Sequence, residues 1–175
     1  MLKRHSLQCL LVAWWVLHIP LGLAQTRDLA VEALVFAQDT PTSEQFSLAA
    51  TRIQWPEYWL DSSDFAPMLI AEQVLTSIKP RLDATGHYPW LGQWSFRQSI
   101  DAQQTGEAVR LVGIKSIDGF IQLKRGDYLE VEVDVEYQPD ATQPRYRIQE
   151  TRQLKFNQLH YFDHPKFGIL LTIQP

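Results

Sequence analysis

Cysteine is almost absent from this chain. The 175 residues contain one, Cys9, near the amino terminus, and no small residue precedes it as a lipid-anchored cysteine would require. If the amino-terminal segment is removed, the remaining chain has neither thiol nor disulfide. We therefore expect a core that is held together by packing alone.

Long apolar runs are also scarce, and the one clear case lies at the amino terminus. A basic start is followed by LQCLLVAWWVLHIPLGLA, which Pro20 interrupts, and by small residues, Gly22 and Ala24, at the −3 and −1 positions of a cleavage site. A membrane anchor would need about 20 apolar residues without a helix breaker near the end. We therefore expect a cleaved signal peptide over residues 1–24, one domain over residues 25–175, and no membrane span after cleavage.

Positive charge is in the minority. Signal cleavage would remove two of the sixteen basic residues and none of the twenty acidic ones, leaving a formal net charge of −6 (14 − 20). A surface of this sign does not attract polyanions, so nucleic acid is not an expected partner. An anionic ligand would require a local basic patch.

Common catalytic signatures are missing as well. The sequence contains no Gly-x-Ser-x-Gly, no His-Glu-x-x-His and no cysteine nucleophile after residue 24. His160 and His164 are four residues apart, as zinc ligands on a helix would be. Their surroundings look extended, however, and on a strand this spacing separates them by about 13 Å. A metal-dependent hydrolase using His160, Asp163 and His164 is the least favoured hypothesis, and we expect no metal and no cofactor.

The strongest structural signal is the alternation of apolar and acidic residues over 129–137, which predicts a strand with one buried face. In the next strand, over 145–155, Arg145 and Arg147 fall opposite the acidic row when both apolar faces point to the core. We interpret this arrangement as a solvated charge ladder rather than a cation site. Glu150 and Arg152 fall on the apolar face, where they pair near an edge or Arg152 faces a pocket.

Other segments complete the fold prediction. Residues 29–36 are apolar on both faces apart from Glu32, which predicts a strand covered on both sides. The 90–100 segment predicts another strand, and Asp118-Gly119 and residues 125–127 predict turns. A helix is expected to start near Pro67, with Asp64 as its cap, and to end or kink at Pro80. We expect an α+β domain: a mostly antiparallel sheet of about six strands with one main helix packed on one face.

Residues 37–65 predict a long irregular loop of a kind that is often functional or mobile. Its aromatic residues, Trp55, Tyr58 and Trp59, either form an exposed surface or fold back as a lid on the core, and we favour the lid.

The carboxy-terminal stretch HYFDHPKFGILLTIQP predicts a hairpin. Pro165 presets φ for a turn, Asp163 is placed to accept backbone N–H bonds, and Gly168 tolerates positive φ. The arms would be residues 159–162 and 169–173. The unbroken aliphatic run suggests that the last strand is internal to its sheet.

The segments GFIQLKRGDYLEVEVDVEY and YRIQETRQLKFNQLHYFDHPKFGILLTIQP resemble the CsiV-type peptidoglycan-binding proteins, which are periplasmic proteins of gammaproteobacteria. VEALVF and WSFRQSI resemble the first strand and the Trp-x-x-x-Gln segment of that family. In the strand of the family a histidine often follows Tyr-Leu, and this chain has Glu130 there, so no role of that histidine carries over. We interpret the signature residues as structural: Tyr161, Asp163, His164, Pro165 and Gly168.

The resemblance implies a periplasmic, non-enzymatic accessory protein. Its expected partners are peptidoglycan and the outer-membrane lipoprotein activator of a class A penicillin-binding protein. A protein-interaction adaptor without direct wall contact is the alternative. The resemblance transfers no binding residue, and the sequence offers as candidates Arg145, Arg147, Arg152, Trp55 and Trp59.

Overall fold

The computed structural model of the chain describes residues 26–38, 52–69 and 73–175. Most of these residues belong to two sheets. Sheet A has five strands in the order β10-β11-β1-β4-β3. The strands of sheet A are β1 (Arg27–Ala37), β3 (Ala66–Pro67), β4 (Trp90–Ile100), β10 (His160–His164) and β11 (Phe167–Gln174).

Sheet B has six strands: the order is β2-β6-β7-β8-β9, and β5 pairs separately with β7. Its strands are β2 (Trp59–Asp61), β5 (Gln104–Thr105), β6 (Ala108–Arg110), β7 (Ile117–Arg125), β8 (Leu129–Tyr137) and β9 (Tyr146–Leu154). All its pairings are antiparallel except that of β2 with β6, which is parallel. The α+β class is confirmed, whereas a single sheet of about six strands is wrong because two sheets share the core.

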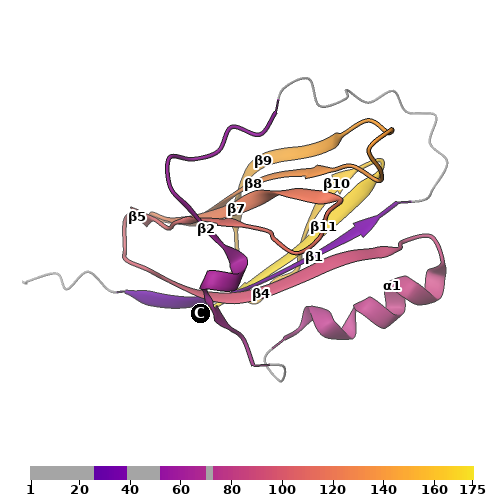
Figure 1. Cartoon of the computed structure of the whole chain (residues 1–175). Coiled ribbons are helices and arrows are strands. Elements are labelled where there is room, and N and C mark those ends of the chain that lie inside the picture. The colour runs from indigo at the N-terminus through magenta and orange to yellow at the C-terminus, as the bar shows by residue number, and fades with distance from the viewer. Residues whose placement is uncertain (1–25, 39–51, 70–72) are drawn as a thin grey trace, which may run out of the picture.

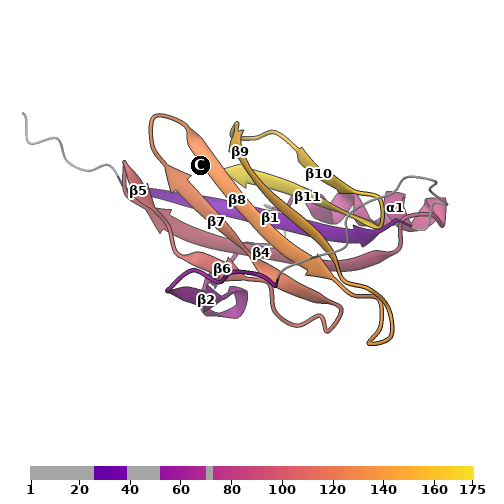
Figure 2. The same ribbon diagram turned by 90° about the horizontal axis from the view of Figure 1, so that it is seen from above.

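The core lies between the sheets. In Figure 1, sheet B lies on one side of sheet A and helix α1 (Lys79–Thr85) on the other. The facing side chains form one cluster, to which alternate positions of each strand contribute, such as Val31 and Val35 of β1 and Val131 and Val133 of β8. Figure 2 shows β9 next to β10 at one side of the sandwich and β2 next to β6 at the other.

The outer face of sheet A is covered by a short helical segment. Leu34 and Phe36 of β1 pack against Leu75 of the 3₁₀ helix η3 (Leu75–Ser77) and against side chains of α1. Glu32, on the same face, is fully buried and accepts hydrogen bonds from the backbone N–H groups of Val74 (2.7 Å) and Leu75 (2.9 Å). The prediction that β1 is covered on both sides is confirmed.

The predicted helix boundaries are wrong. Pro67 lies in β3. Asp64 belongs to the 3₁₀ helix η1 (Ser62–Asp64), where its side chain accepts a hydrogen bond from the backbone N–H of Asp61. Pro80 stands in the first turn of α1, where a residue without an N–H suits the unbonded helix start. Proline therefore begins the helix that we expected it to end.

The predicted turns have mixed outcomes. The turn at residues 125–127 joins β7 to β8 as expected. Asp118-Gly119 instead lies within β7, where Gly119 adopts a φ of 146° and a Cβ would lie 2.3 Å from the carbonyl oxygen of Asp134. A side chain at this position would collide with the neighbouring strand, so glycine serves close strand packing rather than chain reversal.

The predicted carboxy-terminal hairpin is confirmed, with a different turn. Asp163 pairs with Gly168 across the two strands, so Pro165 and Lys166 form the turn. β11 is internal, between β10 and β1, as expected. Gly168 is needed for space: a Cβ there would lie 2.6 Å from Cζ of Phe36 and 2.7 Å from Cε2 of Tyr161.

The expected 37–65 loop is only partly irregular. Residues 39–51 of this range, like the expected signal peptide, lie outside the described residues, and β2 and η1 occupy its second half. Within the described residues, no helix has the length and apolarity needed to cross a membrane.

Candidate functional site

The outer face of sheet B carries the charged rows that the sequence revealed. Asp118 of β7 lies directly opposite Glu136 of β8, and Glu136 lies opposite Arg147 of β9. The predicted charge pairs are present, since Arg145 lies 3.3 Å from Glu136 and Arg147 binds Asp134 through two hydrogen bonds of 2.6 Å.

The expectation that this charge ladder is solvated is wrong for Asp134 and Glu136, at the carboxy-terminal end of β8. Asp134 is 1% exposed and Glu136 is 5% exposed. Residues 52–58, which precede β2, lie over this part of the sheet: the backbone carbonyl of Arg52 accepts a hydrogen bond from Arg147, and Ile53 packs on Phe120. In Figure 1 this segment runs outside sheet B before it enters β2.

The aromatic residues of this segment are partly lid and partly exposed surface. The ring of Trp55 packs between Trp59 (5.5 Å between centroids) and Phe120 (5.6 Å), as the lid interpretation predicts. Trp59 itself is 45% exposed and Tyr58 is 75% exposed. Both alternatives therefore hold, for different residues.

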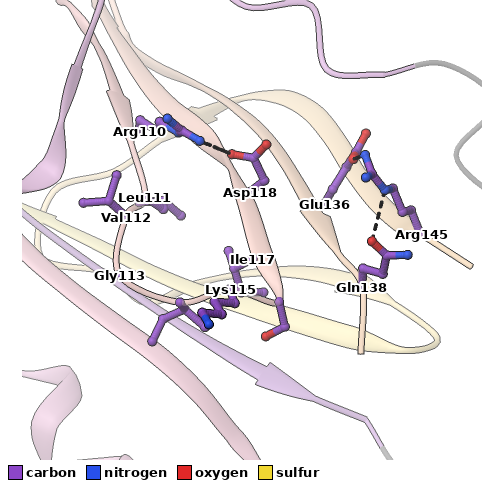
Figure 3. Close-up of a pocket in the computed structure, with 12 residues that line it drawn as sticks. Arg110, Leu111, Val112, Gly113, Lys115, Ile117, Asp118, Glu136, Gln138 and Arg145 are labelled. Carbon is purple, nitrogen blue, oxygen red and sulfur yellow. Dashed lines mark hydrogen bonds and ion pairs between the residues drawn. The ribbon is translucent and has the colours of Figure 1, made fainter. Parts of the chain in front are cut away.

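Beside the aromatic segment lies a cleft of about 530 Å³, walled by the loop between β6 and β7 and by the ends of β8 and β9. Figure 3 shows four charged side chains of the cleft in two pairs: Arg110 and Asp118 lie on one side, and Glu136 and Arg145 lie on the other. Arg110 binds Asp118 at 3.2 Å, and its guanidinium lies 5.3 Å from the ring of Trp55. This contact joins the cleft to the aromatic segment, and together they form the candidate site.

One carboxylate of the cleft is only half satisfied. Oε2 of Glu136 accepts a hydrogen bond from Arg145, whose Nε donates to the side-chain oxygen of Gln138 (3.2 Å). Oε1 of Glu136 is buried and has no hydrogen-bond partner among the described residues. A buried acceptor without a donor is costly, by about 1–3 kcal/mol, which marks this oxygen as a place where a ligand donor would be stabilised.

The structure separates the candidate residues that the sequence proposed. Arg145, Trp55 and Trp59 lie at the candidate site, although they are far apart in the sequence. Arg147 lies on the same face but is held by Asp134, which raises the pKa of its guanidinium through their hydrogen bonds. It is 9% exposed and offers little surface to a ligand.

Arg152 lies elsewhere, on the inner face at the edge of sheet B. It pairs with Glu150, donates a 2.9 Å hydrogen bond to the carbonyl of Tyr161 in β10, and covers the ring of Phe162 at 4.3 Å. Of the two roles that the sequence left open, pairing near an edge is the one observed.

The histidine cluster at the carboxy terminus does not form one site. His160 and His164 share the inner face of β10, whereas Asp163 points to the outer face, since side chains alternate along a strand. Nδ1 of His164 accepts a hydrogen bond from the backbone of Lys166. Within the described part of the chain, no group of three or more His, Cys, Asp or Glu residues is placed to hold a metal ion. His160, Asp163 and His164 therefore do not converge on one site, which removes the geometric basis for a hydrolase that uses these three residues.

The signature residues have packing and hydrogen-bonding contacts. Asp163 accepts hydrogen bonds from the Tyr161 hydroxyl and from Gln38 (2.8 Å), and the Tyr161 ring stacks on Phe36. Burial raises the pKa of the Tyr161 hydroxyl, and the bond to Asp163 raises it further. His164 contacts the rings of Tyr146 and Phe167, and burial lowers its pKa.

Sequence reasoning missed most of the cleft: Arg110, Lys115, Asp118, Glu136 as a site residue, and Gln138. Glu136 was visible only as one member of the acidic row. Asp118 was assigned to a turn. The parallel pairing of β2 with β6, which places Trp59 opposite Ala108, has no local sequence signal.

Comparison with models of protein families identifies the family of this chain. A family model described as "Peptidoglycan-binding protein, CsiV" matches residues 36–175. The chain belongs to the CsiV family. The match covers every strand of both sheets except most of β1, so the resemblance noted from the sequence is confirmed. No curated protein and no solved structure matches the chain.

Proposed function

We propose that this protein is a periplasmic, non-enzymatic accessory protein that binds peptidoglycan through the candidate site on sheet B. Membership of a family described as peptidoglycan-binding is the observation that carries the proposal. The site is chemically suited to it. Exposed aromatic rings pack against the apolar faces of sugars, and the neighbouring arginines and carboxylates offer hydrogen bonds to amide and carboxyl groups of the wall peptides.

The charge of the protein agrees with a local contact rather than a diffuse one. The chain is acidic overall, and peptidoglycan is anionic, so long-range attraction does not drive association. Arg110, Lys115 and Arg145 concentrate basic side chains around one cleft. Wall binding should therefore depend on this cleft and weaken only moderately as salt is raised.

Sedimentation with purified sacculi tests the proposal. The wild-type protein without residues 1–24 should pellet with sacculi, and the double variant Trp59→Ala, Arg145→Glu should remain largely in the supernatant. Trp90→Ala is the matched control, since Trp90 is 38% exposed and lies on β4 of sheet A, away from the cleft. A wild-type protein that stays in the supernatant would contradict wall binding, and equal loss in the control variant would contradict the assigned site.

The role in wall synthesis extends this proposal. The resemblance to CsiV-type proteins supports an interaction with the outer-membrane lipoprotein activator of a class A penicillin-binding protein. Pull-down of that lipoprotein by the mature chain, with and without sacculi, tests the interaction directly. Failure of the pull-down in both conditions would contradict the interaction with the lipoprotein and would leave the proposal of wall binding unchanged.

A protein-interaction adaptor is a second candidate, and one observation favours it. Tyr58, Trp59 and Leu60 are consecutive, apolar and at least 39% exposed each. Such patches are typical of protein contacts. Tyr58→Ser with Leu60→Ser should abolish partner pull-down while sacculus binding persists if this surface serves a protein. Loss of sacculus binding in the same variant would assign the surface to the wall instead.

A further inference from the structure

We propose that the cleft recognises a free α-amino-acid group, an ammonium and a carboxylate on the same carbon, in the peptide part of peptidoglycan. This inference rests on the proposed function and specifies which part of the polymer the site binds. Three features of the cleft carry it: an unsatisfied buried acceptor, a second carboxylate facing it, and cationic side chains on either side.

The unsatisfied acceptor is Oε1 of Glu136. The residue is 5% exposed and lines the cleft, its other oxygen is bound by Arg145, and no described residue donates to Oε1. A carboxylate oxygen accepts and cannot donate, so the missing partner is a donor. A charged donor gives the strongest hydrogen bond at such a position.

The second carboxylate indicates that the donor group is positively charged. Asp118 lies directly opposite Glu136 across β7 and β8, and pairs this close have Cβ atoms about 5 Å apart. Arg110 pairs with Asp118 and Arg145 with Glu136 from the outer sides (Figure 3), and Arg147, which lies opposite Glu136, is bound to Asp134. The space between them is the anionic centre of the cleft, and an ammonium group would be stabilised there.

Cationic side chains surround this centre and suit a carboxylate on the same ligand. Lys115 is exposed on the wall between β6 and β7, and no ion pair involving it occurs among the described residues. The side chain of Arg145 is 47% exposed, so it can change rotamer to open Oε1 and turn its guanidinium to the ligand. The pattern of a negative centre with a positive rim is complementary to a zwitterion.

Within peptidoglycan, this chemistry discriminates between glycan and peptide. The glycan strands present hydroxyl, N-acetyl and carboxyl groups but no ammonium. A diamino acid in the wall peptide has a free ammonium and a carboxylate on one carbon wherever it is not cross-linked. The cleft should therefore favour regions of the wall in which these groups are free.

Titration with a small probe tests the inference separately from wall binding. By nuclear magnetic resonance or calorimetry, meso-2,6-diaminopimelic acid should bind and shift signals of the cleft, whereas pimelic acid, which has both carboxylates and no ammonium, should bind at least about tenfold more weakly. Equal binding of both compounds, or binding of neither, would overturn the inference.

Three variants locate the binding. Glu136→Gln and Lys115→Glu should each lower the affinity for the probe about tenfold, since each removes a charge-assisted contact. Lys115→Glu changes an exposed loop residue and is expected to fold normally. Glu130→Gln is the matched control, because Glu130 lies in the same row of β8 and pairs with Lys124 outside the cleft. An unchanged affinity in both cleft variants would overturn the assignment.

Sacculi and amidase-stripped glycan strands distinguish the inference from the proposed function. Retention on sacculi together with loss on stripped strands supports both. Equal retention on the two materials leaves wall binding intact and overturns the peptide site. Absence of sacculus binding with specific probe binding overturns the proposed function and supports the zwitterion site.

Discussion

The outer faces of the two sheets each bury a glutamate, and the two glutamates differ in how they are satisfied. On sheet A, both oxygens of Glu32 accept backbone N–H groups at the start of the helical segment. On sheet B, Glu136 uses one oxygen and leaves the other without a donor among the described residues. Both oxygens of Glu32 are satisfied within the fold, whereas the unbonded oxygen of Glu136 calls for a partner, which the proposed ligand would supply.

The largest effect is expected where sheet B itself depends on a buried ion pair. Arg147→Met leaves Asp134, 1% exposed, without its counter-charge and should lower the free energy of unfolding by about 3–5 kcal/mol. Equilibrium unfolding in urea measures the loss. Arg147→Met combined with Asp134→Leu should recover much of it, and a double variant as unstable as the single one would contradict the explanation.

The comparison of the two glutamates is sharpened by the same substitution at both positions. Glu32→Gln replaces one acceptor by an NH₂ group that faces a backbone N–H, and it should lower the free energy of unfolding by about 2–3 kcal/mol. Urea denaturation, with the slope checked for constancy, provides the measurement.

Glu136→Gln should have a smaller effect, at most about 1 kcal/mol, because the oxygen that it alters has no donor to lose. The contrast between the two variants is the prediction. Equal destabilisation would mean that Glu136, like Glu32, serves the fold alone.

The smallest effect concerns His164, at the end of β10. Burial lowers its pKa, Asp163 opposes this and Lys166 adds to it, so the folded state favours the neutral ring. The unfolded chain has a pKa of about 6.5. Stability from this residue is therefore complete above that value and is lost as the pH falls towards the lowered pKa of the folded state.

Thermal unfolding at pH 7.5 and pH 5 checks the effect. The wild-type Tm should fall by more than that of His164→Phe, which retains a ring beside Tyr146 and Phe167 but does not titrate. A variant with the same pH dependence as the wild type would assign that dependence to other groups.

Local patterns predicted the strands well, because alternation reports directly on burial. The 129–137 strand, its pairing with Arg145 and Arg147 opposite the acidic row, and the inward position of Glu150 and Arg152 all followed from parity alone. The helix was misplaced because a proline can either end a helix or stand in its first turn, and Pro80 stands in the first turn of α1.

The sequence did not predict which residues lie together at the candidate site. Trp59 is placed beside β6 by the parallel pairing of β2 with β6. Asp118 belongs to a strand, although the Asp118-Gly119 pair indicated a turn. Residues of an irregular segment cover part of sheet B, as Ile53 does at Phe120, and such long-range contacts have no periodicity to detect. Arg145 was proposed for its charge and its place opposite the acidic row, and the structure adds Gln138 as a partner.

The pairing of β1 with β11 makes the order of synthesis important. The first described strand, β1, is hydrogen-bonded on one side to β11, so the pairing on that side of β1 cannot form until the eight residues of β11 have left the ribosome. Contacts between such distant segments slow folding. A nonsense mutation that removes β11 would therefore take away an internal strand of sheet A rather than a tail.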